Sequence, residues 1–128
     1  MTWSADDLDR IDTADEMRVA GRRRDGRLRP ARIVWMVVLD GTLYSRSVNG
    51  PDAAWFRGTR ATRRGHIEAG GVDADVEFVD VDPADAVQAD LDAAYRQKYG
   101  RRYPGPTEQI MAATARSATV KILPQPTV

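Results

Sequence analysis

Two Asp-Gly pairs, Asp25-Gly26 and Asp40-Gly41, restrict the fold of this sequence more than any other feature. Both residues of such a pair tolerate the positive φ that a type I′ turn requires, and this turn joins neighbouring antiparallel strands. Alternating apolar residues precede the first pair at 17–21. The apolar run 33–39 lies between the two pairs and is typical of a central strand. We therefore expect an antiparallel meander of four strands in this half of the chain.

The remaining elements are predicted from capping residues and periodicity. Ser4 followed by Asp7 is an N-terminal helix signature, and Gly70-Gly71 predicts a further hairpin. A single apolar stripe predicts a helix, since four residues recur at helical spacing: Val87, Leu91, Tyr95 and Tyr99. The expected order is an N-terminal helix over 1–15, barrel strands over 16–82 with a short helix over 52–62, a helix over 83–99, and a short helix and last strand over 107–123.

Six or seven antiparallel strands in a chain of this length would expose long edges in an open sheet. Closure into a small barrel removes those edges, so we expect a mainly β (α+β) fold: a six- to seven-stranded antiparallel barrel with flanking helices. With 128 residues, the chain is expected to form one domain over 1–128.

Composition excludes several kinds of chemistry. The chain has no cysteine and a single histidine, His66, so a thiolate site or a cluster of histidine ligands is impossible within it. No apolar run approaches the roughly 20 residues of a membrane span. The N-terminus is acidic and carries no signal-peptide pattern. We expect a soluble cytoplasmic protein without a metal.

Positive charge is unevenly distributed and is almost entirely arginine. Only two residues, Lys98 and Lys121, among the 19 basic ones are lysines, although the formal net charge is zero. Arginines crowd residues 18–32, whereas residues 73–92 are acidic. Duplex nucleic acid usually binds a more uniformly basic domain, so we interpret the cluster as a local anion site and not as a nucleic-acid surface. A solvated hairpin paired with the acidic segment is the alternative.

One stretch, residues 21–57, combines this basic hairpin with further recognisable elements. A strand with Trp35 follows the hairpin, then come an Asn49-Gly50 turn and Ala54-Trp55-Phe56-Arg57. This spacing resembles the deazaflavin-dependent nitroreductase branch of the flavin-binding split barrels. Over about 8–123 the chain is still more similar to a family of small bacterial proteins, domain of unknown function 2255. The resemblance implies a split β-barrel, and by itself no reaction.

The resemblance also implies a set of cofactor-binding residues: Arg24, Gly26, Arg27 and Arg29 for a phosphate-bearing tail, then Arg32, Trp35, Ser47, Asn49, Trp55 and Arg57. An arginine-rich turn offers forked, charged donors to phosphate oxygens, which agrees with this assignment. Asp25 departs from the family pattern, because a carboxylate repels phosphate unless an arginine pairs with it. Tyr44 is a candidate proton donor. The tryptophans also fit a core role, and Asn49-Gly50 also fits simple turn chemistry.

Three functions remain open from the sequence. The first is an oxidoreductase that binds FMN or a deazaflavin of the coenzyme F-420 type and transfers a hydride to a small organic substrate. The second is a cofactor-free small-molecule binder or a cyclase or isomerase that uses Tyr44, Arg46 or Asp52. The third is an interaction module; the resemblance implies a homodimer in any case, since split barrels commonly pair through their sheets.

Overall fold

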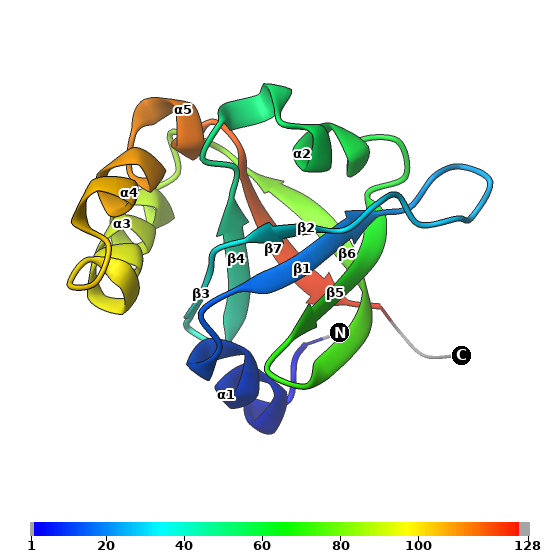
Figure 1. The fold of residues 1–128 in the computed structure, drawn as a ribbon, viewed down its shortest axis with the longest axis horizontal. Helices are drawn as coiled ribbons and strands as arrows, with labels where there is room; N and C mark the ends of the chain where they lie inside the picture. The colour runs from blue at the N-terminus through cyan, green and yellow to red at the C-terminus, as the bar shows by residue number, and fades with distance from the viewer. Residues whose placement is uncertain (1, 126–128) are drawn as a thin grey trace.

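The computed structural model describes residues 2–125, which form a β-barrel with helices at both ends and along one side (Figure 1). The elements are, in chain order, α1 (Ala5–Thr13), β1 (Met17–Gly21), β2 (Arg32–Val34), β3 (Met36–Leu39), β4 (Thr42–Arg46), the 3-10 helix η1 (Gly50–Asp52), α2 (Ala54–Gly58), β5 (Arg64–Ala69), β6 (Val72–Val81), α3 (Val87–Tyr99), α4 (Pro104–Ile110), α5 (Ala113–Arg116) and β7 (Thr119–Pro124). None of the described helices is long and apolar enough to cross a membrane.

All seven strands belong to one antiparallel sheet in the order β2-β1-β5-β6-β7-β4-β3. The two edge strands, β2 and β3, are consecutive in the chain and only Trp35 separates them. The sheet therefore curls until its edges meet at this residue, which gives a nearly closed barrel. The expected fold class, mainly β (α+β) with flanking helices, is confirmed.

Two of the three predicted type I′ turns are present. Asp40 and Gly41 have φ values of 50° and 74°, and Gly70 and Gly71 have 57° and 84°. At the first Asp-Gly pair the turn type was wrong, because only Gly26 is in the left-handed region (φ 90°). Its N–H donates to the Arg23 carbonyl (2.9 Å) in a longer loop. The return strand is reduced to one bridge between Arg22 and Leu28.

The predicted central strand 33–39 and the four-stranded meander are wrong. The run is divided into β2 and β3, which lie at opposite edges and do not pair with each other. Trp35 leaves the sheet between them and stacks on Tyr99 of α3, with ring centroids 4.0 Å apart and planes 1° from parallel. Ile33 of β2 is 58% exposed, as an edge residue can be.

Helix boundaries also differ from the expected ones. The helix expected over 83–99 begins at Val87, because the Asp82 carboxylate and carbonyl accept the N–H groups of Ala84 and Asp85 in a preceding turn. The helix expected from residue 107 begins at Pro104 and is divided into α4 and α5. A proline fits there because the first helical turn needs no N–H from it. The short helix 52–62 is η1 followed by α2.

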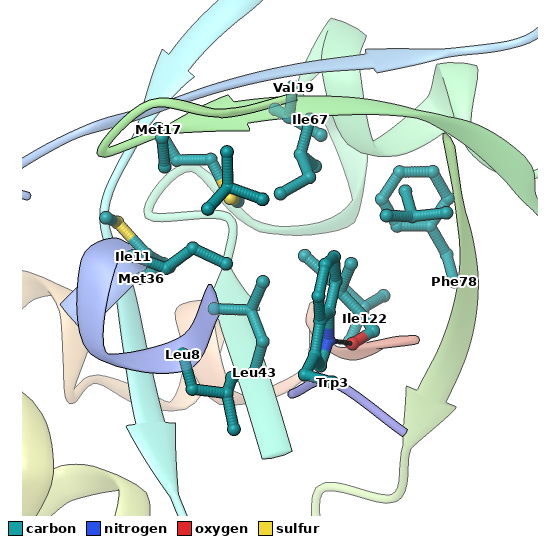
Figure 2. Close-up of a cluster of buried hydrophobic side chains, with 14 of the residues drawn as sticks. Trp3, Leu8, Ile11, Met17, Val19, Met36, Leu43, Ile67, Phe78 and Ile122 are labelled. Carbon is teal, nitrogen blue, oxygen red and sulfur yellow. Dashed lines mark hydrogen bonds between the residues drawn. The ribbon is translucent and has the colours of Figure 1, made fainter. Parts of the chain in front are cut away.

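The main core fills the barrel (Figure 2). Leu8 and Ile11 of α1 close one end of it, and Ser4 caps this helix by accepting the Asp7 N–H, as predicted. Trp3 enters from the N-terminal segment and donates from its indole N–H to the Ile122 carbonyl (2.8 Å). A second cluster lies between the outer face of β3 and β4 and the helices, where the predicted stripe of α3 is buried: Leu91, Tyr95 and Tyr99.

Candidate functional site

A large cavity, called the main cleft here, opens beside the point where the barrel edges meet. It has a volume of about 600 Å³, within the range usual for ligand sites. β2, Trp35, the end of β4, the η1–α2 segment and α4 form its walls. The lining residues are Glu16, Arg32, Ile33, Val34, Trp35, Arg46, Ser47, Val48, Asn49, Ala53, Ala54, Trp55, Pro106, Gln109 and Ile110. An apolar surface with a few polar groups is typical of small-molecule sites.

A smaller cavity of about 130 Å³, called the arginine pocket here, adjoins the main cleft. Its lining residues are Gly21, Arg23, Arg29, Pro30, Arg32, Ala54 and Trp55. Arg32, Ala54 and Trp55 line both cavities. The two spaces therefore form one site with an apolar body and a cationic end.

The arginine pocket exists because β1 and α2 approach each other at two glycines. A Cβ on Gly21 would collide with the Gly58 carbonyl, and a Cβ on Gly58 would collide with the Arg29 side chain. Arg29 is fixed in turn by its N–H, which donates to the Gly21 carbonyl (2.9 Å). The Arg29 guanidinium is thus held against the end of α2, next to Trp55.

Buried polar atoms without hydrogen-bond partners are concentrated at this site. Within residues 2–125 they are Arg29 Nε, Arg46 Nε and Ser47 Oγ. Arg29 lines the arginine pocket, and Arg46 and Ser47 line the main cleft. Such atoms are rare in native proteins because each lost partner costs about 1–3 kcal/mol. The two arginine nitrogens can only donate, whereas the Ser47 hydroxyl can donate or accept.

Ion pairs within the protein determine which hairpin arginines remain available to bind an anion. Asp25 accepts from the Arg27 guanidinium (3.0 and 3.1 Å), and the Arg27 N–H and guanidinium hold the pKa of Asp25 below its usual value. Arg22 pairs with Asp75 (3.1 Å). Among the described residues, no carboxylate pairs with the three arginines of the pocket: Arg23, Arg29 and Arg32. The pairing of Asp25 removes the expected repulsion of phosphate.

Two tryptophans flank the main cleft. One face of Trp35 is covered by Tyr99, and Tyr103 lies 5.6 Å from its ring centre. Trp55 packs edge-on against the buried Phe56. Both indoles are partly buried, so each is anchored in the fold while part of its surface borders the cleft. They are placed to contact the faces or edges of a planar ligand.

A buried ionic network fixes the helical wall of the cleft. The Arg46 side chain is fully buried and contacts the Asp92 carboxylate (2.6 Å), the Ile110 carbonyl (3.0 Å) and the Gln88 amide oxygen (2.7 Å). Arg116 also binds Asp92. Burial raises the pKa of Asp92, but hydrogen bonds from Arg116 and Arg46 outweigh it, so the pKa is lowered. Arg46 joins β4 to α3 and α4, and Asp92 joins α3 to α5.

The structure brings together six of the residues named for cofactor binding: Arg29, Arg32, Trp35, Ser47, Asn49 and Trp55. Arg46, named for the cofactor-free alternative, also lines the main cleft. Five others line neither cavity: Arg24, Gly26, Arg27, Arg57 and Tyr44. Tyr44 packs in the second cluster, where burial raises the pKa of its phenol. Sequence reasoning missed Arg23 and the α4 wall. Arg23 belongs to the recognised basic hairpin, but no local pattern relates α4 to a cleft formed some 60 residues earlier.

No group of three or more histidine or acidic side chains within residues 2–125 is placed to hold a metal ion. His66 contacts Asp73 and Asp75 on the outer face of β5 and β6 (Nδ1 to Asp75 Oδ1, 2.9 Å). Burial lowers the pKa of His66, but the two carboxylates together raise it by more than burial lowers it, so the net shift is upward. The histidine therefore forms a surface ion pair outside the cleft.

Comparisons with known proteins agree with this architecture. Residues 7–122 match the family described as uncharacterized protein conserved in bacteria (DUF2255). None of the curated proteins compared matches the chain. Among solved structures, the heme storage protein HutZ from Vibrio cholerae is 10% identical, with a TM-score of 0.68 over 99% of this chain and 93% of that one.

Two further solved structures are similar to the chain. An FAD-binding protein from Mesorhizobium loti is 20% identical, with a TM-score of 0.56 over 98% of this chain and 93% of that one. An F420 reductase is 17% identical, with a TM-score of 0.52 over 100% of this chain and 97% of that one. At these identities the likeness shows a shared fold.

Proposed function

The chain belongs to the DUF2255 family of bacterial proteins, and from this premise we propose that it binds a flavin- or deazaflavin-type cofactor in the main cleft and the arginine pocket. We propose further that it is an oxidoreductase, which transfers a hydride to a small organic substrate. One observation carries the proposal: every buried, unpartnered side-chain polar atom of residues 2–125 belongs to a residue of these two cavities, and all can donate.

The donor chemistry fits such a cofactor. Arg29 and Arg32, supported by Arg23, would hold the phosphate-bearing tail, because guanidinium groups bind phosphate oxygens in a forked geometry. Ser47 and Asn49 would donate to the polar edge of the ring. When bound, the ring supplies the hydride chemistry, and the protein supplies orientation and charge.

The apolar walls fit the ring itself. Trp35 cannot swing freely, because its stack on Tyr99 and the hydrogen bond from Ser45 to its carbonyl (2.7 Å) fix its position. Trp55 lies where the two cavities meet, so it would lie between the ring and the tail. Rigid aromatic walls keep water out and lose little conformational entropy on binding.

The solved structures support the class of ligand. The FAD-binding protein and the F420 reductase are named for flavin-type molecules, and HutZ is named for heme. These ligands share a planar ring and anionic groups. A cleft with aromatic walls and an unpaired cationic end on the same barrel suits that combination. A carboxylate in the hairpin, Asp25, was an argument for a site without a phosphate-bearing cofactor. Because Asp25 is paired with Arg27, that argument no longer holds.

A titration of ligand fluorescence tests the proposal. We expect FMN or coenzyme F-420 to be quenched when micromolar protein is added, because the ring would contact Trp35 and Trp55. Riboflavin, which has the ring without the phosphate, is the matched ligand and should bind more weakly than FMN. Protein that is colourless as purified and quenches neither cofactor would refute the proposal.

We also propose that the protein is a homodimer paired over the mouth of the cleft. Ile33 and Val48 line the cleft and are 58% and 41% exposed, so two large apolar side chains lie uncovered beside an unpaired sheet edge. A second copy would cover both. Light scattering should give twice the mass of the chain, and a monomer at micromolar concentration would contradict the dimer.

A further inference from the structure

A third cavity, lined by a potentially reactive side chain, lies away from the other two. Its lining residues come from β3 and from the helices on either side of that strand, α1 and α3 (Figure 1). Its volume is about 250 Å³ and it shares no lining residue with the main cleft or the arginine pocket. The lining residues are Asp12, Val37, Val38, Ala94, Gln97 and Lys98. This cavity combines a small apolar surface with one amine and one carboxylate.

The amine of Lys98 is held in place but is poorly compensated. The side chain is 14% exposed. Its Nζ donates to the Met36 carbonyl (3.2 Å) and lies 5.3 Å from the centre of the Tyr99 ring. The nearest carboxylate oxygen, on Asp12, is 3.9 Å away. An ammonium has three hydrogens to donate, and this site gives one of them a close acceptor.

The electrostatic surroundings make the Lys98 amine easier to deprotonate than an exposed lysine. Burial lowers the pKa of Lys98; Asp12 and Asp15 oppose the shift, Arg102 adds to it, and the net direction is downward. Arg102 is itself bound to Asp15 (2.8 Å), so much of the Asp15 charge is already compensated. A neutral lysine amine is the form that attacks carbonyl carbons.

We propose that Lys98 is a nucleophilic amine that condenses with a small aldehyde bound in this cavity. The amine nitrogen forms a bond to the carbonyl carbon, and the carbonyl oxygen takes up protons and leaves as water, so that an imine remains and no oxidant is needed. Val37, Val38 and Ala94 would contact the alkyl part of the aldehyde. Asp12 is placed to pass the proton between the nitrogen and the departing oxygen.

The chain provides its own internal comparison, because Lys121 is the only other lysine. It lies on β7 opposite Tyr44 and Val79, is also partly buried, and lines none of the cavities described here. The α-amino group at the N-terminus is a third amine of known ordinary reactivity. A site-specific reaction can therefore be separated from general amine reactivity in one sample.

The test is reductive trapping of the full chain with butanal and cyanoborohydride, followed by peptide mass mapping. We expect the butyl adduct on Lys98 to form faster than that on Lys121. It should be lost in Lys98→Arg, which keeps the positive charge and the long stem. Asp12→Asn also lowers the pKa of Lys98, because the Asp12 carboxylate raises it. The two proteins are therefore compared at a pH where the amine is neutral in both, and there Asp12→Asn should be labelled more slowly. Circular dichroism of both variants controls for folding.

Equal labelling of the two lysines, or faster labelling of Lys121, would overturn the proposal and leave Lys98 as a structural link between α3 and β3. An unchanged rate in Asp12→Asn at a pH where the amine is neutral in both proteins would contradict the role of Asp12 in proton transfer. None of these outcomes depends on whether a flavin binds in the main cleft.

Discussion

Replacement of Arg29 by alanine is the sharpest single test of the arginine pocket. The Arg29 Nε is buried without a partner, and its side chain is fixed between Gly58 and the hairpin. A phosphate bound in the pocket would gain a charged hydrogen bond from the Arg29 guanidinium, which no carboxylate of residues 2–125 neutralises. Loss of such a bond costs about 1–3 kcal/mol, which weakens FMN binding roughly 5- to 150-fold.

Two controls isolate the effect on the phosphate. Riboflavin lacks that group, so Arg29→Ala should leave its dissociation constant unchanged. The double variant Asp25→Asn with Arg27→Gln removes an ion pair of the same hairpin at constant net charge, and the Asn oxygen can still accept the N–H of residue 27. We expect FMN affinity to be unaffected by this pair of substitutions.

The assay is fluorescence quenching of each ligand at two salt concentrations. Salt should weaken FMN binding to the wild type more than to Arg29→Ala, because one cation of the site is missing in the variant. Equal losses for FMN and riboflavin in Arg29→Ala would show that the side chain supports the fold and not the phosphate. Unchanged FMN affinity would place the anion site elsewhere.

Three further predictions concern stability, and each is measured by denaturant unfolding. Arg46→Met breaks a buried ion pair, which typically lowers the free energy of unfolding by about 3–5 kcal/mol. Because Arg116 still binds Asp92, we expect a loss at the lower end of this range. A loss below about 1 kcal/mol would contradict the network. Gly21→Ala forces a methyl group against the Gly58 carbonyl, so it should lower the free energy of unfolding by about 1–3 kcal/mol and weaken FMN binding. Unchanged stability would show that β1 and α2 can move apart to accept the methyl group. The pKa of His66 is raised in the folded state, so its ion pairs stabilise the protein below pH 6.5 and that contribution disappears as the pH rises through the higher folded value. His66→Gln should accordingly destabilise the protein more below pH 6.5 than in alkaline solution, and a pH-independent difference would refute the assignment.

Local turn chemistry was the most predictable part of the fold. Asp40-Gly41 and Gly70-Gly71 form the expected turns, because two adjacent residues that tolerate positive φ leave the chain few other choices. Asp25-Gly26 differs because the Asp25 carboxylate accepts the N–H of Arg27 and so stabilises a longer loop. Side-chain competition of this kind is not visible in the dipeptide itself.

Barrel closure was predictable, but the position of the seam was not. An apolar run such as 33–39 looks the same whether it is one central strand or two edge strands separated by a residue that turns outward. The stack of Trp35 on Tyr99 decides between them, and these residues are distant in sequence. Burial of Arg46 escaped prediction for the same reason, since its partners lie on helices much later in the chain.

The candidate site was predictable where one local segment builds it. The hairpin and the turn at Asn49 contribute residues that line the two cavities, and that these residues bind a cofactor stays a prediction. That resemblance could not separate Arg29 from Arg27. They are two residues apart, yet one is held over α2 and the other is neutralised by Asp25.

A crystal structure of the chain grown with FMN would test the central claim most directly. The account predicts the phosphate within hydrogen-bonding distance of Arg29 and Arg32, and the ring in the main cleft between Trp35 and Trp55. Phosphate density away from these guanidinium groups, or a ring bound outside the cleft, would contradict it.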